Sequence, residues 1–298
     1  MQPEFDPERG LWVASHPDAV AAVLAHPACR VRPLGEPVLG SSAAGILSKL
    51  ARRTEGEAHR LARAAIVQAL ATLDLDEVTA VTRRLAKERD GLALTQWVFD
   101  VPTRVVAELL GAPGTVVPAT AAFVHCLSPL STPVQLAAAD LAADELMRDI
   151  GALMAAPTGL TAALCRHGLP RDVAVANLVG LLSQTHEATA GLIGNRIVAV
   201  LHGGTQAEGP VVNTRRFVSE DSTIAGVAMQ AGATILVMLG ESGFGQGRHA
   251  CPGQQLATTI ADAAMAHLEG RLDPAVLGWT YRASANARLP EFFIKETP

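Results

Sequence analysis

The chain has 298 residues, of which 49% are hydrophobic and 4% aromatic, and its formal charge at neutral pH is −5. This charge excludes bulk attraction to nucleic acid or to an anionic membrane surface. The sequence shows no membrane-length apolar run, no signal peptide in its acidic start MQPEFDPERG, and four cysteines without disulfide-framework or zinc spacing. Because alanine, leucine and valine dominate the apolar residues, we expect a soluble, cytoplasmic, mainly helical protein.

In the first half of the chain, apolar residues recur mostly at helical spacing. A short strand is expected at 11–14, followed by a helix that ends near Pro27 and a glycine- and serine-rich loop at 34–48. Asp100 before Pro102 is typical of a helix N-cap with a first-turn proline. The further helices predicted here run over 57–71, 76–89, 100–110 and 135–154, with a proline-rich loop and one helical piece between 111 and 133.

The second half begins with the longest helical pattern, over 172–201, which stops at Gly203-Gly204. β-Branched runs broken by glycines over 211–239 then predict hairpins. A glycine-rich loop follows, and Pro252 is expected to open a helix that stops at Gly270, before a strand-like tail at 279–294. With no repeat and no linker, the chain is expected to be one domain over 1–298, mainly α with small β-sheets (α+β).

The segment from Phe244 to Ala257, FGQGRHACPGQQLA, contains the most informative cysteine. Cys251 stands where the glycine-rich loop enters a helix, and the free N–H groups and helix dipole there favour a thiolate. Glycines at 245, 247 and 253 permit the close approach of a flat, bulky group. A thiolate held in this way suits axial ligation of haem iron. The alternative is a buried cysteine beside an ordinary turn, which is what we expect of Cys29, Cys126 and Cys165.

This segment resembles the cysteine-ligand loop of the cytochrome P450 family. The resemblance implies a P450-like fold that binds haem b, with Cys251 as the metal ligand. Other segments follow in the family's order, and they imply that the haem propionates are contacted by a His and Arg pair on one helix face and by Arg216 in a strand, whereas Arg215 points to the other face. The residues implied in cofactor binding are His59, Arg63, Arg216, His249, Phe244, Gly245 and Gly253.

The middle of the long helix departs from the family's pattern of Ala-Gly-acid-Thr over the haem. Gln184 and Thr185 replace the small pair, Glu187 keeps the acid, and Ala188 replaces the alcohol. The resemblance implies that Gln184, Glu187 and Thr189 line the distal side, with Glu187 as proton donor. Thr189 does not simply substitute for the alcohol, because one residue along a helix is a rotation of about 100°.

The chain also looks contracted. Leu201 runs through HGGTQAEGP to Val211, which leaves no room for the family's helix with Glu-x-x-Arg, and after Leu239 the cysteine segment follows almost at once. The start also omits the family's first helix. We therefore expect a truncated P450-like fold in which a partner chain replaces the missing elements that pack the cysteine loop.

These features together imply a haem-thiolate oxidoreductase, similar to a monooxygenase, that acts on a small molecule in a bacterial biosynthetic pathway of secondary metabolism. With Ala188 in place of the alcohol, the chemistry expected is oxidation, peroxide-driven oxidation or a redox-neutral rearrangement. The alternatives are a non-catalytic haem protein (a sensor, carrier or partner subunit) and a haem-free relic. The partners implied are a ferredoxin-type electron donor and a second copy of the chain in a homodimer.

Overall fold

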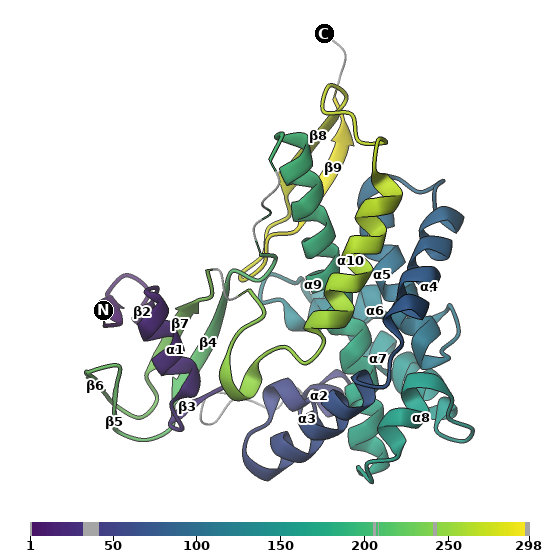
Figure 1. Ribbon diagram of the computed structural model, residues 1–298. Helices are drawn as coiled ribbons and strands as arrows, with labels where there is room; N and C mark the ends of the chain where they lie inside the picture. Colours follow the sequence, from purple (N-terminus) through teal and green to yellow (C-terminus); the bar gives the residue numbers. More distant parts are fainter. Residues whose placement is uncertain (1, 32–41, 205–206, 208, 241–242, 296–298) are drawn as a thin grey trace.

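The computed structural model describes residues 2–31, 42–204, 207, 209–240 and 243–295. The fold is mainly α with small sheets, as the sequence predicts. Figure 1 shows the five-stranded sheet with α1 on one side and the other helices gathered beside it. The helices are α1 (Pro17–Ala25), α2 (Ser42–Leu47), α3 (Gly56–Leu70), α4 (Leu75–Glu88), α5 (Leu94–Leu110), α6 (Val116–Phe123), α7 (Pro133–Leu153), α8 (Gly159–Cys165), α9 (Arg171–Leu201) and α10 (Gln254–Leu268), with 3₁₀ turns η1 (Ala51–Arg53), η2 (Val124–Leu127) and η3 (Gly247–His249).

The larger sheet has the strand order β1-β2-β7-β4-β3, so it joins the start of the chain to the segment that follows α9. Strand β2 pairs in parallel with β7, whereas the other pairs of this sheet are antiparallel. Two separate hairpins complete the strands. The strands are β1 (Glu4–Asp6), β2 (Leu11–Ala14), β3 (Cys29–Arg30), β4 (Asn213–Val218), β5 (Ser222–Ile224), β6 (Val227–Met229), β7 (Thr234–Met238), β8 (Leu277–Tyr281) and β9 (Pro290–Ile294).

Helix α9 forms the centre of the main core, where it packs against α5, α10 and α7. Several of its apolar side chains, including Leu182, Ile193 and Ile197, are fully buried. A second, smaller core lies between α1 and the sheet and includes Leu24 and Ile235. The two cores meet around the loop between β7 and α10, which runs between the sheet and the helices (Figure 1).

The start of α5 differs from the prediction. The helix begins at Leu94, so Asp100 is not an N-cap and Pro102 lies inside the helix. Trp97 and Val98 are buried in this first stretch, and the Trp97 Nε1–H donates to the Ala86 carbonyl at 3.0 Å. Their burial outweighs the roughly 3 kcal/mol that an interior proline costs a helix. Asp100 instead accepts from Arg104 at 2.6 Å, one helical turn later.

Three other boundaries depart from the pattern. Helix α10 begins at Gln254 with Gly253 as its N-cap, so Pro252 precedes the helix instead of opening it. Helix α8 and strands β1 and β3 were not predicted. The loop expected at 34–48 lies partly outside the described residues, and its end forms α2.

Among the helices that the structure describes, none combines the length and hydropathy needed to cross a lipid bilayer.

The contraction predicted after α9 is present. Between the end of α9 and β4, the described residues contain no helix, and the described part of the stretch from β7 to η3 contains none either. In the described residues of this stretch, no helix or strand separates β7 from the cysteine segment.

Asn177 connects α9 to the turn before α3. Its side-chain oxygen accepts the Ala51 N–H at 2.9 Å, and its Nδ2 donates to the Lys49 carbonyl at 3.0 Å. Asn177 is buried. This residue therefore fixes where α3 starts relative to α9.

We predict that Asn177→Ala lowers the free energy of unfolding by about 1–3 kcal/mol, because it leaves the buried Ala51 N–H without an acceptor. Urea denaturation followed by circular dichroism measures the change. The exposed Asn286→Ala is the matched control and should change stability by less than about 0.5 kcal/mol. Equal effects of the two substitutions would contradict the assignment.

Candidate functional site

The cysteine loop, residues 243–253, is closed by its own backbone. The Cys251 N–H donates to the Phe244 carbonyl at 2.8 Å. Gly245 and Gly247 adopt φ values of 70° and 69°, which side chains rarely allow. At Gly247 a Cβ would also lie 3.1 Å from the Leu24 carbonyl oxygen, because the loop presses against α1 there. Gly247, one of the glycines expected to permit the close approach of a ligand, thus allows the loop to pack closely against α1.

The Cys251 thiol has a pKa above its ordinary value. Desolvation by the surrounding loop is the main cause, and the Gly253 N–H and the Arg63 guanidinium act in the opposite direction. The expectation that the helix end favours a thiolate is therefore wrong for this structure in its net effect. The reason is that desolvation outweighs the favourable contribution of the Gly253 N–H, which lies directly before α10.

Two other cysteines, Cys29 and Cys126, also have raised pKa values. Burial raises the pKa of both Cys29 and Cys126 to about 11. Cys251 is exposed, whereas Cys29 is buried and Cys126 and Cys165 are half-buried. Cys251 is thus the most accessible thiol of the chain.

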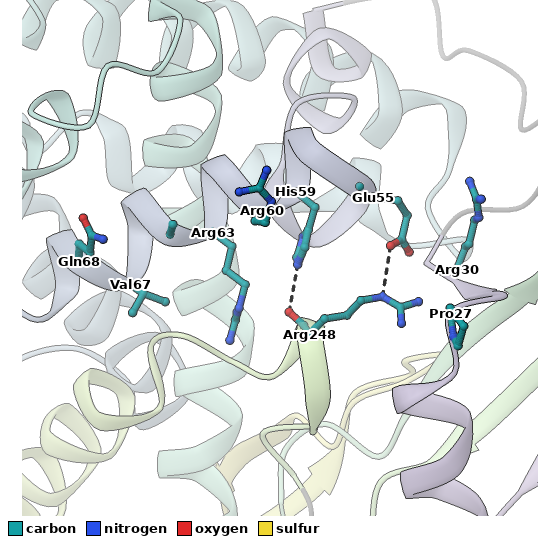
Figure 2. A pocket seen from close by; sticks show the side chains of 11 residues that line it. Pro27, Arg30, Glu55, His59, Arg60, Arg63, Val67, Gln68 and Arg248 are labelled. Carbon is teal, nitrogen blue, oxygen red and sulfur yellow. Dashed lines mark hydrogen bonds and ion pairs between the residues drawn. The ribbon is translucent and has the colours of Figure 1, made fainter.

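Helix α3 presents His59 and Arg63 to the cysteine loop, from one helix face as predicted. His59 Nε2 lies 3.0 Å from the Arg248 carbonyl oxygen and its Nδ1 lies 2.7 Å from the Ala51 carbonyl oxygen. Arg63 Nη1 donates to the Ala250 carbonyl at 2.7 Å. Figure 2 shows both side chains reaching from α3 toward the loop. In this structure the pair holds backbone carbonyls on either side of His249.

Arg216 and His249 are buried with side-chain nitrogens that lack hydrogen-bond partners. Arg216 is 4% exposed, and its Nη1 donates to Thr214 Oγ1 and to the Arg215 carbonyl. Its Nε makes no hydrogen bond, and the described residues place no carboxylate in contact with it. Burial lowers the pKa of Arg216, and the Arg248 charge adds to the effect. Arg215 is exposed, as predicted from the alternation of the strand.

Both ring nitrogens of His249 are buried and make no hydrogen bond. The Glu55 carboxylate is close by, with its Oε1 3.4 Å from His249 Nε2. Burial lowers the pKa of His249, although Glu55 opposes the change. The site therefore holds a buried guanidinium and a buried imidazole whose polar atoms are incompletely satisfied.

Two residues of this site were missed by the sequence reasoning, Glu55 and Arg248. Glu55 Oε2 lies 3.4 Å from Arg248 Nε, and its Oε1 accepts the Val31 N–H at 2.8 Å. Burial tends to raise the pKa of Glu55, but His249, the Val31 N–H and Arg248 lower it to about 2. The one available signal was that Glu55 precedes His59 by four residues, which places the two on the same side of the first turn.

The residues predicted for the distal side lie on different faces of α9. Gln184 is exposed and its Nε2 donates to the Gly180 carbonyl at 2.8 Å. Glu187 is half-buried, and Thr189 is buried. Two residues along a helix correspond to about 200°, so Glu187 and Thr189 leave α9 in nearly opposite directions. A shared role for these residues stays a prediction.

Glu187 has two arginines within electrostatic reach that the sequence did not indicate. Burial raises the pKa of Glu187, while Arg282 and Arg52 act to lower it. Desolvation lowers the pKa of Arg52 to about 10, with the neighbouring Arg53 as a second cause. Arg282 lies 4.7 Å above the Phe99 ring and donates to Glu291 at 2.9 Å. No motif in the sequence joins these residues, because they come from a turn and a distant hairpin.

A cavity of about 840 Å³ lies between α3, β3 and the cysteine loop. Figure 2 shows Arg30, Arg60, Arg63 and Arg248 around it, with Glu55 and His59 beside them. Neither Cys251 nor Glu187 is among its lining residues. It is therefore a cationic recess beside the cysteine loop, separate from the face of α9 that carries Glu187.

Comparison with known proteins gives a uniform result at the level of structure. No family model and no curated protein matches the sequence. The chain is similar to P450BioI in complex with an acyl carrier protein ligated to hexadec-9Z-enoic acid, with a TM-score of 0.82 and 18% identity over 95% of this chain and 91% of that one. It is similar to CYP109E1 from Bacillus megaterium in complex with testosterone, with a TM-score of 0.77 and 19% identity over 98% and 93% of the two chains.

The P450 monooxygenase TamI with bound tirandamycin C is also similar, with a TM-score of 0.78 and 20% identity over 95% and 89% of the two chains. At these identities the likeness concerns the arrangement of the backbone, and it extends over nearly the whole chain. The chain has the fold of the cytochromes P450.

Proposed function

We propose that the chain binds haem b through Cys251 and acts on a small molecule as a haem-thiolate oxidoreductase. The observation that carries the proposal is the exposed Cys251 in a loop beside the incompletely satisfied Arg216 and His249. When bound, haem supplies an iron centre that activates an oxidant or polarises a substrate. Following the likeness to monooxygenase structures, we place the activity in a bacterial biosynthetic pathway of secondary metabolism, in the cytoplasm.

The residues present fit the anionic edge of haem. A buried guanidinium without a contacting carboxylate is unfavourable, and so is a buried imidazole without a hydrogen bond. A propionate would satisfy both Arg216 and His249. His59 and Arg63 support the same edge indirectly, by holding the carbonyls of Arg248 and Ala250. Phe244, Gly245 and Gly253 shape the loop around the sulfur.

In the proposed site Cys251 provides the sulfur ligand, and the loop controls its charge. The Gly253 N–H and the Arg63 guanidinium both favour the thiolate. Binding to a metal cation deprotonates a thiol outright, which overcomes the desolvation that raises its pKa. The backbone hydrogen bond from Cys251 to Phe244 keeps the sulfur at the mouth of α10.

On the distal side we propose Glu187 as proton donor, with Gln184 beside it and Thr189 as an auxiliary residue. The raised pKa keeps a larger share of Glu187 protonated near neutral pH, as a donor needs. Ala188 provides no hydroxyl to relay the proton. We therefore favour peroxide-driven oxidation or a redox-neutral rearrangement beside ordinary monooxygenation.

For partners we propose a ferredoxin-type electron donor and a homodimer. An acidic donor matches the charge of the recess lined by Arg30, Arg60, Arg63 and Arg248. A second copy would cover the region where the chain is contracted, and the low share of charged residues, 18%, favours such contact.

The alternative function is non-catalytic haem binding, as a sensor, carrier or partner subunit. It is favoured by Ala188 and by the burial of Thr189 away from Glu187. Titration with substrate-like ligands separates the two functions. A shift in the iron spin state with turnover supports the enzyme, whereas haem binding without any distal response supports the alternative.

We predict that the chain, expressed with haem supplied, shows the absorption of thiolate-ligated haem after reduction with carbon monoxide. Cys251→Ala should abolish this absorption, because it removes the sulfur ligand. Cys165→Ala, a half-buried cysteine on α8, is the control and should retain it. Unchanged ligation and activity in Cys251→Ala would refute the proposal.

We predict that Arg216→Met has opposite effects on folding and on haem binding. Without haem it should raise the free energy of unfolding by about 1–2 kcal/mol, because it removes a buried, unpaired charge. With haem it should weaken binding, because one propionate loses its cation. Denaturant unfolding and haem titration measure the two effects. Arg215→Met on the exposed face of β4 should change neither, and a haem affinity unaffected by Arg216→Met would contradict the assignment.

We predict that Glu187→Gln raises stability at neutral pH and lowers turnover. A carboxyl whose pKa is raised on folding favours the folded state at acid pH, and this contribution is lost as pH rises from the ordinary carboxyl range through the folded pKa. The amide avoids that loss, so the stability gain should appear at pH 7 and vanish near pH 4 in denaturation curves.

The same substitution should reduce peroxide-supported oxidation of a chromogenic test substrate by about 10²–10⁴-fold, the usual contribution of a positioned proton donor. Glu220→Gln, an exposed carboxylate beyond β4, is the control for both measurements. If Glu187→Gln leaves turnover intact, another group delivers the proton.

A further inference from the structure

The cysteine loop depends on a few side chains for its position. Among the described residues, no helix or strand lies between β7 and η3 to support it. Its own backbone bond, from Cys251 to Phe244, closes the loop but does not attach it to the rest of the protein. The attachments come from α3, through His59 and Arg63, and from the side chain of Arg248.

Arg248 binds two segments outside the loop through its guanidinium. Nη1 donates to the His26 carbonyl at 3.1 Å, and Nη2 donates to the Cys29 carbonyl. These acceptors belong to the end of α1 and to β3. One side chain thus ties the cysteine loop to the end of α1 and to β3, an edge strand of the sheet.

Glu55 joins this guanidinium to α3. It occupies the N-cap position of α3 but makes no capping hydrogen bond. Its carboxylate instead lies 3.4 Å from Arg248 Nε and 3.4 Å from His249 Nε2, while it accepts the Val31 N–H at 2.8 Å. Figure 2 shows Glu55 and Arg248 facing each other at the mouth of the cationic recess.

An exposed ion pair contributes little, so burial decides how much this pair matters. The side chains of Glu55 and Arg248 are 20% and 28% exposed. The guanidinium also holds two backbone carbonyls, and the carboxylate also holds a backbone N–H. Removing either partner leaves the other partly buried and unbalanced, which costs more than the loss of a surface contact.

We propose that Glu55 and Arg248 form a lock that positions the cysteine loop, and with it Cys251, against α1, β3 and α3. They are positioning residues, since neither contacts the sulfur. The lock acts on the chain without haem, and its consequence for thiolate ligation rests on the proposed function.

Hydrogen exchange of the haem-free chain, read by mass spectrometry over residues 247–251, tests the lock. Arg248→Gln and Glu55→Gln should each speed exchange of these amides about tenfold or more, while α4 and α5 keep their protection. The double variant should be no faster than the faster single variant, because the two residues act as a unit. Additive effects, or exchange as slow as in the unaltered chain, would overturn the lock.

A matched control is the ion pair between Arg196 and Asp262, which joins α9 to α10 at 2.5 Å. Arg196→Gln removes an arginine–carboxylate pair whose carboxylate is more exposed, and it should leave exchange of residues 247–251 unchanged. If Arg248→Gln does not fold, Arg248→Lys replaces it. Lysine keeps the positive charge but lacks the planar, multiply donating guanidinium. The increase in exchange rate should therefore be several-fold smaller than with glutamine.

A spectroscopic readout separates positioning from general stability. After reduction with carbon monoxide, the thiolate-ligated share of bound haem should fall in Arg248→Gln, be intermediate in Arg248→Lys and stay unchanged in Arg196→Gln. An unchanged share in Arg248→Gln would refute the positioning role. If neither the unaltered chain nor any variant binds haem, the proposed function fails. The exchange result still decides whether Glu55 and Arg248 position the loop.

Discussion

The position of Cys251 depends on hydrogen bonds between α3 side chains and the carbonyl oxygens of the cysteine loop. A glycine-rich segment has many accessible conformations and does not hold a sulfur in place by itself. His59 and Arg63 bind the carbonyls on either side of His249, and these contacts select one conformation. The start of α3 is in turn fixed to α9 through Asn177. The centre of the helical core therefore positions the loop, through α3.

Several charged groups around the loop are less stable in place than they would be in water. Arg216 is buried beside the positive Arg248, and burial disfavours the charged forms of both Arg216 and His249. Proteins keep such groups where a ligand or a reaction uses them. Glu55 balances part of this positive charge, which explains how its carboxyl keeps a pKa of about 2 despite partial burial.

The polar residues proposed for the distal side and the residues buried in the core lie mostly on different faces of α9. Gln184 and Glu187 lie where the helix is open, while His186 and Thr189 are buried on the opposite side. His186 contacts Thr103, whose hydroxyl oxygen lies 3.0 Å from His186 Nδ1. With Ala188 between them, the exposed face offers an acid and an amide but no alcohol.

Sequence patterns alone determined the helical class and the order of most elements, whereas the contraction after α9 and the interest of the cysteine loop followed from the resemblance to a known family. They also placed His59 and Arg63 on one helix face and separated the buried Arg216 from the exposed Arg215, because periodicity reports which side of an element meets the protein. Only the tertiary structure decided what those side chains touch. Arg248 and Glu55 stand 193 residues apart, and His59 and the Arg248 carbonyl 189 apart. Such contacts depend on how separate elements pack, as does the continuation of α5 through Pro102, where burial of Trp97 outweighs a local helix-breaking signal.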